Sequence, residues 1–291
     1  HVNMRGGATG TGIQNGSGGG DSTYRYFGKF EVPSGSVSGN WVALESGTEF
    51  KVQNLNAGSY NMYINSGSKL VVSEVLTSTN WENKSSNQER FKTLKGEIIC
   101  GTFKFSGTNW GTKSYLTASG NGGGVIKAGT IENDKKEGPQ YIHSNGATAE
   151  WLVGAGGLKY NTKATSADAI FAVNQDVTIR SYADWELQGN AYGGGKKGFR
   201  FAAAKTLKLD TADYYEKDEN GNGIPRTVKL TGIITGGGQV RVIGTGTVIF
   251  NAVHEYTAHT TVTDASTIII PADKKPGTGN VILSSTSRLF L

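Results

Sequence analysis

Short segments of alternating apolar and polar residues recur along the chain at a nearly constant spacing. In the C-terminal part they begin at Trp185, Thr206, Thr227, Thr247, Thr267 and Arg288. Near the N-terminus the same pattern begins at Lys29, Glu49 and Lys69. Side chains alternate between the two faces of a strand, so Phe50 and Val52 share one face and Lys51 points to the other. Each segment therefore predicts a short strand with one buried face.

The spacing between these strands indicates a solenoid. A period of about 20 residues is too short for a pair of helices or a propeller blade, and the spacing of leucine-rich repeats is absent. The intervals are rich in Gly, Ser, Thr and Asn, which favour turns. We therefore predict an all-β fold, a single-stranded right-handed parallel β-helix with one coil per period. Residues 1–22 are interpreted as a Gly-rich flexible leader and 23–291 as the β-helix, irregular over 75–180 and regular over 181–291.

Composition excludes several other classes of protein. Glycine makes up 43 of the 291 residues without a collagen period, and 28 aromatic residues are too many for a disordered chain. The single cysteine excludes an internal disulfide framework and a cysteine-based zinc site. No apolar run is long enough for a membrane-spanning helix. The net charge is +5, and the lysine pairs at 135–136, 196–197 and 274–275 lie in separate predicted loops, which does not favour nucleic-acid binding.

One stretch of the C-terminal half is similar to a known repeat. Residues 236–270 read GGGQVRVIGTGTVIFNAVHEYTAHTTVTDASTIII. The segment from Gly244 to Val248, the pair Tyr256–Thr257 and the triplet Thr260–Val262 resemble the autotransporter-associated β-strand repeat. His259 stands near a position where that repeat often has glycine. The resemblance covers about residues 150–291 and implies a right-handed β-helix in a secreted or surface-displayed bacterial protein. It implies no catalytic residues.

An acidic segment interrupts the repeats between the strands at 206–209 and 227–230. Asp218, Asn220 and Asn222 fit the first half of a calcium-binding loop, because oxygen ligands at alternate positions suit a hard cation. The second half does not fit, since Arg226 and Lys229 occupy the ninth and twelfth positions. We interpret the segment as a loop inserted between two coils that needs no cofactor, with calcium binding as the alternative.

The tryptophans have two interpretations. Trp41, Trp81, Trp110 and Trp151 are either core residues or platforms that stack on sugar rings. Trp185 falls on an inward position of its repeat and is predicted to be core.

The single cysteine and two of the histidines indicate no functional site. Cys100 ends an apolar run and is predicted to be a buried, inert thiol, while His254 and His259 are five residues apart and should face opposite ways on an extended strand.

The outward position of the regular repeats changes from charged to apolar toward the C-terminal end. In chain order it reads Glu186, Lys208, Lys229, Ile249, Ile269, Phe290. A soluble monomer seldom leaves an apolar stripe bare. We therefore expect Ile249, Ile269 and Phe290 to form a contact surface, covered by a further C-terminal segment, another copy or a partner. A loop from 251–266 or 271–280 folded over the stripe is the alternative.

Two classes of function agree with these features. The first is a secreted or cell-surface, outer-membrane-associated β-helix module without catalysis, an adhesin-like binding or structural passenger whose partner is a glycan or the surface of a host or neighbouring cell. The second is a polysaccharide-active enzyme, a lyase or a glycoside hydrolase. A hydrolase needs two carboxylates about 5 to 9 Å apart. The recognised outward positions do not stack two acids, but residues 75–180 leave room for such a site.

Overall fold

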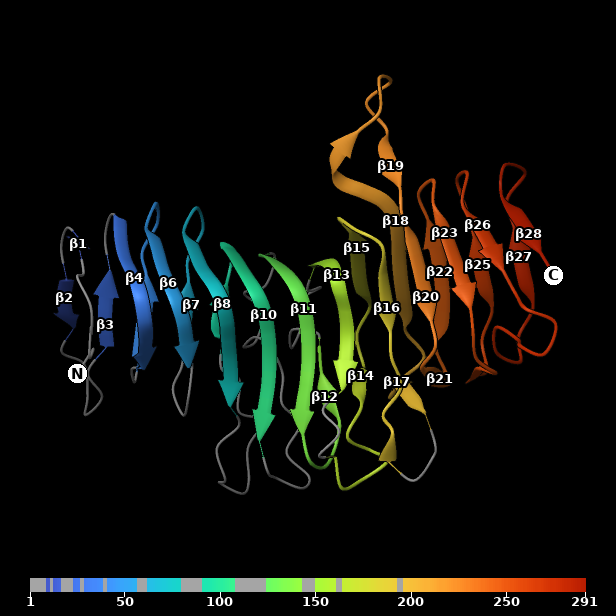
Figure 1. The fold of residues 1–291 in the computed structure, drawn as a ribbon, viewed down its shortest axis with the longest axis horizontal. Coiled ribbons are helices and arrows are strands. Elements are labelled where there is room, and N and C mark those ends of the chain that lie inside the picture. Colours follow the sequence, from blue (N-terminus) through green and yellow to red (C-terminus); the bar gives the residue numbers. More distant parts are fainter. Residues whose placement is uncertain are drawn as a thin grey trace.

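A computed structural model gives the fold. It describes the backbone of residues 9–10, 13–16, 23–26, 29–38, 41–56, 62–79, 91–107, 124–142, 150–160, 164–192 and 196–291. Within these, it describes the side chains of residues 44–55, 64–77, 95–106, 124–142, 150–160, 164–192 and 196–291. Strands and turns stack in a row from the N-terminus to the C-terminus, and none of the described residues is in an α-helix (Figure 1). Consequently, this part of the chain contains no helix long and apolar enough to cross a membrane.

The molecule is a parallel β-helix, as the repeat spacing predicts. Sixteen parallel strands form one curled sheet that covers two faces of the coils. The first face, called here the first column, contains β4 (Lys29–Ser38), β6 (Glu49–Asn56), β8 (Lys69–Thr79), β10 (Glu97–Gly107), β11 (Val125–Lys135), β13 (Glu150–Tyr160), β15 (Val177–Ser181), β18 (Thr206–Lys217), β22 (Gln239–Ile243), β25 (Thr260–Val262) and β27 (Val281–Leu283). The second column contains β16 (Trp185–Leu187), β20 (Thr227–Leu230), β23 (Thr247–Phe250), β26 (Thr267–Ile269) and β28 (Arg288–Phe290).

Shorter strands form the third face of the coils. One group contains β2 (Ile13–Gly16), β3 (Thr23–Tyr26), β5 (Trp41–Leu44), β7 (Met62–Ile64) and β9 (Phe91–Leu94). The other contains β12 (Gln140–Tyr141), β14 (Phe171–Val173), β17 (Lys197–Phe201), β21 (Ile233–Gly236) and β24 (Glu255–Tyr256). Two strands run antiparallel to the first column, namely β1 (Thr9–Gly10), which pairs with β4, and β19 (Gly223–Pro225), which pairs with β18. Because β1 and β2 lie within residues 1–22, the structure places strands in the stretch that the sequence suggested as a flexible leader.

The alternation inside each repeat is confirmed by burial and register. Phe50 pairs with Leu70, which pairs with Ile98, and all three side chains point into the coil and are buried. Lys51, one position after Phe50, is exposed. Stacking of like residues at successive coils gives one continuous apolar core along the axis. Cys100 and Trp185 belong to this core, as predicted.

The coil length is less regular than the sequence pattern suggests. Paired residues of the first column are 20 positions apart between Arg241 and Thr261, but 33 apart between Lys208 and Arg241 (241 − 208). The strand that begins at Thr206 belongs to the first column, whereas those that begin at Trp185 and Thr227 belong to the second and pair directly. The prediction that all three share one column was therefore wrong. The spacing between Thr206 and Thr227 equals the repeat period although the two strands belong to the same coil. The segment between Asp210 and Thr227, which is an insertion, accounts for this spacing.

His254 is buried at the third face of the coils. His254 is fully buried next to Phe250, whose ring is 5.4 Å away and perpendicular to the imidazole. Its Nδ1 accepts a hydrogen bond from the backbone N–H of Ile234 at 3.1 Å, so the proton of the neutral ring lies on Nε2. Burial lowers the pKa of His254 to about 4. His259 is exposed, which confirms that the two histidines face opposite ways.

The stability of the fold should therefore fall in mild acid. The unfolded chain binds a proton at His254 near pH 6.5, whereas the folded protein resists protonation until about pH 4. The contribution of the neutral ring is thus complete above pH 6.5 and is lost as the pH falls toward 4, at up to about 1.4 kcal/mol per pH unit. Denaturant unfolding at pH 8, 6, 5 and 4 measures this slope.

Two variants distinguish the contribution of His254 to the loss of stability in acid from that of other titratable groups. His254→Leu should be less stable than the native protein at pH 8, because the N–H of Ile234 loses its acceptor, but should show a flatter dependence on pH. His259→Gln removes an exposed histidine of the same coil and should keep the native slope. An equal slope in His254→Leu and the native protein would show that other groups cause the loss.

Candidate functional site

The insertion between Asp210 and Thr227 is a β-hairpin that projects from the side of the β-helix (Figure 1). Strand β18 continues beyond the coil as far as Lys217, and β19 returns antiparallel to it, with Ala212 opposite Pro225. The hairpin lies inside one coil, between its first-column and second-column strands, and not between two coils as the sequence suggested. An antiparallel arm satisfies its own backbone, so the coil can admit it without losing its stacking on either neighbour.

The three residues of the candidate calcium loop form the tip of this hairpin. Oδ1 of Asp218 accepts hydrogen bonds from the backbone N–H groups of Asn220, at 2.9 Å, and Asn222, at 2.8 Å. Such contacts are typical of a side chain that closes a turn. They hold the pKa of Asp218 below its ordinary value. Within the described part of the chain, no three His, Cys, Asp or Glu side chains are grouped so that they could hold a metal ion.

Asp213 anchors the base of the hairpin. Its carboxylate is inaccessible to solvent and accepts hydrogen bonds of 2.7 Å from the N–H groups of Tyr215 and Glu216 and from Nε of Arg226. Burial alone would raise the pKa of this carboxyl, but these three hydrogen bonds outweigh burial and hold the pKa below 3.8. The same carboxylate therefore fixes the backbone of β18 and joins it to the strand that returns to the coil.

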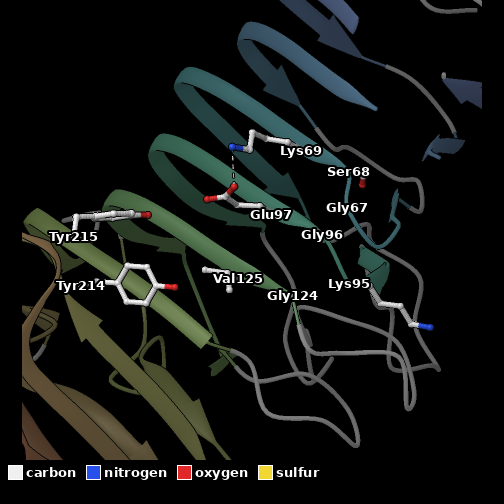
Figure 2. A pocket seen from close by; sticks show the side chains of 10 residues that line it. All are labelled: Gly67, Ser68, Lys69, Lys95, Gly96, Glu97, Gly124, Val125, Tyr214 and Tyr215. Carbon is white, nitrogen blue, oxygen red and sulfur yellow. Dashed lines mark ion pairs between the residues drawn. The ribbon is translucent and has the colours of Figure 1, made fainter. Parts of the chain in front are cut away.

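Two tyrosines next to this anchor face the N-terminal coils. Tyr214 and Tyr215 are 41% and 45% exposed, and their rings are perpendicular with centroids 4.9 Å apart. Figure 2 shows both hydroxyl groups directed toward the first residues of β10 and β11. Neither hydroxyl forms a hydrogen bond with any residue that the structure describes. Exposed rings with free hydroxyls are suited to a ligand that has both apolar and polar surfaces.

A cleft of about 510 Å³ separates the tyrosines from the β-helix. Its other wall is formed by the starts of three successive first-column strands, where Lys69, Glu97 and Val125 are paired in register (Figure 2). Lys69 and Glu97 form an ion pair of 3.0 Å. A glycine precedes each strand or lies close before it, at 67, 96 and 124. At Gly96 the missing side chain allows close packing of the chain, because a Cβ atom there would overlap the carbonyl oxygen of Ser68. The volume is within the range of small-ligand sites.

Apolar and charged side chains of the first column support the tyrosines from below. Lys127 and Arg180 face outward on β11 and β15, and Leu152 of β13 lies between them in the same row. The ring of Tyr215 lies 4.0 Å from Nζ of Lys127, and the ring of Tyr214 lies 5.9 Å from Cζ of Arg180. Leu152 points outward but is fully buried, which is explained if the two tyrosines cover it. The hairpin is therefore packed on the β-helix.

Tyr182 completes the aromatic group. Its ring contacts Tyr215 at 6.0 Å and lies 4.7 Å from Nζ of Lys127. A Cβ atom at Gly154 would lie 2.6 Å from the hydroxyl oxygen of Tyr182, so glycine at this position lets the ring lie against β13. Burial raises the pKa of Tyr182 to about 12. Burial, together with the negative charge of Glu97, also raises the pKa of Tyr215 to about 12. Both hydroxyls are therefore protonated donors at neutral pH.

The acids that the structure describes around the cleft are all paired. Arg180 binds Glu150 through Nε and Asp210 through Nη1, the latter at 2.7 Å. Glu97 and Asp213 are paired with Lys69 and Arg226 as described above. A general acid or base needs a titratable group that is free to exchange a proton with the substrate. Among the described residues, no carboxylate around the cleft is therefore free of an ion-pair partner.

The tryptophans do not contribute to the cleft in the way the sequence suggested. Trp151 is fully buried, and its Nε1 donates a hydrogen bond of 2.8 Å to the carbonyl of Ile142. It packs against Phe103 in the core, so its interpretation as a sugar platform was wrong. Trp81 and Trp110 lie outside the described residues, as does the side chain of Trp41, whose backbone begins β5.

The apolar stripe is present in the second column. Lys229, Ile249, Ile269 and Phe290 pair in register on successive strands. Ile249 and Ile269 are half-buried, and Phe290 is 55% exposed. Lys208 is absent from this row, because it lies in the first column next to Arg241. The role of the stripe as a contact surface stays a prediction.

Comparisons with known proteins return no family, no curated protein and no solved structure that matches this chain. The class that the fold defines is a parallel β-helix with an inserted hairpin that forms a cleft against its own first column. The similarity to the autotransporter-associated repeat stays an expectation from the sequence.

Removing the anchor should release the hairpin while the β-helix remains folded. Asp213→Ala leaves the N–H groups of Tyr215 and Glu216 and the guanidinium of Arg226 without their acceptor, at a cost of about 1–3 kcal/mol. We expect rapid proteolysis within residues 214–224 and an unchanged far-UV circular dichroism spectrum. Glu216→Ala is the matched control. Its carboxylate also binds Arg226 but is 63% exposed, so its loss should cost at most about 1 kcal/mol. Equal protease resistance of the two variants would contradict the role of Asp213.

Proposed function

We propose that the protein is a non-catalytic β-helix module that binds glycans in the cleft between the hairpin and the first column. The observation that carries this proposal is the pair Tyr214 and Tyr215, opposite the Lys69–Glu97 ion pair. Asp213 holds the backbone of this pair, the rings are exposed, and the hydroxyls bond to no described residue. The C–H faces of a sugar ring can pack on such aromatic rings. The sugar hydroxyls can bind the phenols and the two charged groups.

The rigidity of the site supports binding. Three hydrogen bonds fix Asp213, and the rings rest on Lys127 and Arg180, so little conformational freedom remains to be lost when a ligand enters.

The setting of the module is also proposed. The resemblance to the autotransporter-associated repeat supports a secreted or cell-surface protein of the adhesin type, whose partner is a glycan on another surface. The stripe of Ile249, Ile269 and Phe290 supports a second contact, in which the C-terminal coils associate with another copy or with further chain. The polysaccharide lyase or hydrolase is the alternative function, and the pairing of the acids around the cleft is the reason for placing it second.

Loss of the two rings should abolish glycan binding. We expect the double variant Tyr214→Ala, Tyr215→Ala to bind at least about tenfold more weakly than the native protein to any glycan that the native protein retains in affinity electrophoresis. Tyr192→Ala is the control, because Tyr192 is also 45% exposed but does not line the cleft. Equal losses in both variants, or none in either, would contradict the proposed site.

The same samples test the alternative. A lyase acting on an acidic polysaccharide releases unsaturated products that absorb in the ultraviolet, and a hydrolase releases reducing ends. Neither signal should rise above a control without protein. Turnover that survives the tyrosine double variant would place an active site elsewhere in the chain.

A further inference from the structure

The strongest clue to the kind of glycan is the charge of Lys127. Lys127 is half-buried on β11, two residues after Val125 and on the same outward face. Its ammonium lies between two aromatic rings, at 4.7 Å from the centroid of Tyr182 and 4.0 Å from that of Tyr215. Attraction between a cation and the faces of aromatic rings holds the side chain in this position. A positive charge is thus fixed next to Tyr215, which lines the cleft.

Lys127 has no acidic partner among the described residues, whereas three other cations near the cleft do. Lys69 is paired with Glu97, Arg226 with Asp213, and Arg180 with two carboxylates. Lys95 lines the cleft and also forms no ion pair with a described residue, but Figure 2 shows its amine directed away from the tyrosines. None of the described carboxylates lies within ion-pair distance of Lys127. Within the described part of the chain, its charge is therefore compensated by aromatic rings alone, so it can attract an anion bound beside Tyr215.

Nearby hydroxyl groups complete a site for an anion. The phenol hydroxyls of Tyr214 and Tyr215 form no hydrogen bond with a described residue, and both are protonated donors at neutral pH. Hydrogen bonds to a charged acceptor are shorter and stronger than neutral ones. Among the described lining residues Glu97 is the one carboxylate, and its ion pair with Lys69 weakens its repulsion of an anion.

We propose, on the basis of the proposed glycan-binding function, that the ligand is an anionic glycan. Its carboxylate or sulfate binds the ammonium of Lys127 and the hydroxyl of Tyr215, while its sugar ring packs on Tyr214 and its hydroxyls bind Lys69 and Glu97. Lys127 is the residue that selects acidic over neutral sugars, and the tyrosines bind both.

The test compares three ligands by calorimetric titration at 50 and 300 mM NaCl. These are an oligogalacturonate, the same oligosaccharide with its carboxyl groups methyl-esterified, and a sulfated oligosaccharide of similar length. The native protein should bind at least one of the two acidic ligands about tenfold more tightly than the esterified one at low salt, and this preference should shrink at high salt because ions screen it. A preference for the uronate identifies carboxylate as the anion, and a preference for the sulfated ligand identifies sulfate.

Three variants assign the preference to one side chain. Lys127→Met keeps the length of the side chain and should lower affinity for the preferred acidic ligand about tenfold, leaving the esterified ligand unchanged. Lys127→Arg should retain most of the preference. Lys229→Met removes one positive charge from an exposed position of β20, outside the cleft, and should behave as the native protein. Thermal melting confirms that each variant is folded.

The possible outcomes distinguish failure of this inference from failure of the proposed glycan-binding function. Equal binding of acidic and esterified ligands by the native protein, with loss of both in the tyrosine double variant, would overturn the inference and leave glycan binding intact. An equal effect of Lys127→Met and Lys229→Met would overturn it as well, by showing that only overall charge matters. Absence of binding to all three ligands at millimolar concentration would overturn both proposals.

Discussion

Registration of one coil on the next is the constraint on which this structure depends. Every first-column strand must place its inward side chains over those of its neighbour, as Phe50, Leu70 and Ile98 do. A coil has no core of its own, so its apolar side chains are buried only by this stacking. The chain between registered strands is free to vary, and coils of very different length occur in one helix because each returns to the same row. Insertions are therefore tolerated where their two ends meet.

The hairpin uses this freedom. It leaves the coil after Asp210 and returns at Thr227, and the paired backbone of its arm leaves the stacking beneath it undisturbed. The buried carboxylate of Asp213 fixes the hairpin as one wall of the cleft, because it joins both ends of the insertion. Packing of Tyr214 and Tyr215 on the row that contains Lys127, Leu152 and Arg180 sets the direction of that wall.

Sequence reasoning could predict the scaffold but not the site. The alternation around Phe50 and Val52 depends only on local geometry, so the strand faces and the burial of Trp185 followed from it. The column of the strand at Thr206 did not follow, because spacing alone cannot distinguish a coil from part of a coil plus an insertion. Trp151 showed the same limit, since its position within an irregular coil gave no inward or outward phase.

The tyrosines were missed for a related reason. Tyr214 and Tyr215 stand side by side within the segment that interrupts the repeats, and adjacent large aromatic residues in an otherwise polar insertion are a signal that could have singled them out. Their partners could not be found in this way. Lys127 and Tyr215 are 88 positions apart, and their meeting depends on the lengths of all the coils between them.

Because of that dependence, the number of coils between the two walls decides which residues face each other across the cleft. One wall consists of the first residues of strands β8, β10 and β11, whereas the other is the hairpin that begins with β18, farther along the axis. Gain or loss of one whole coil between them would leave the core intact but slide the tyrosines by one strand spacing, about 4.8 Å. They would then face a different row of side chains. Recombination between repeats can thus change what such a protein recognises in discrete steps, without a single substitution in the tyrosines themselves.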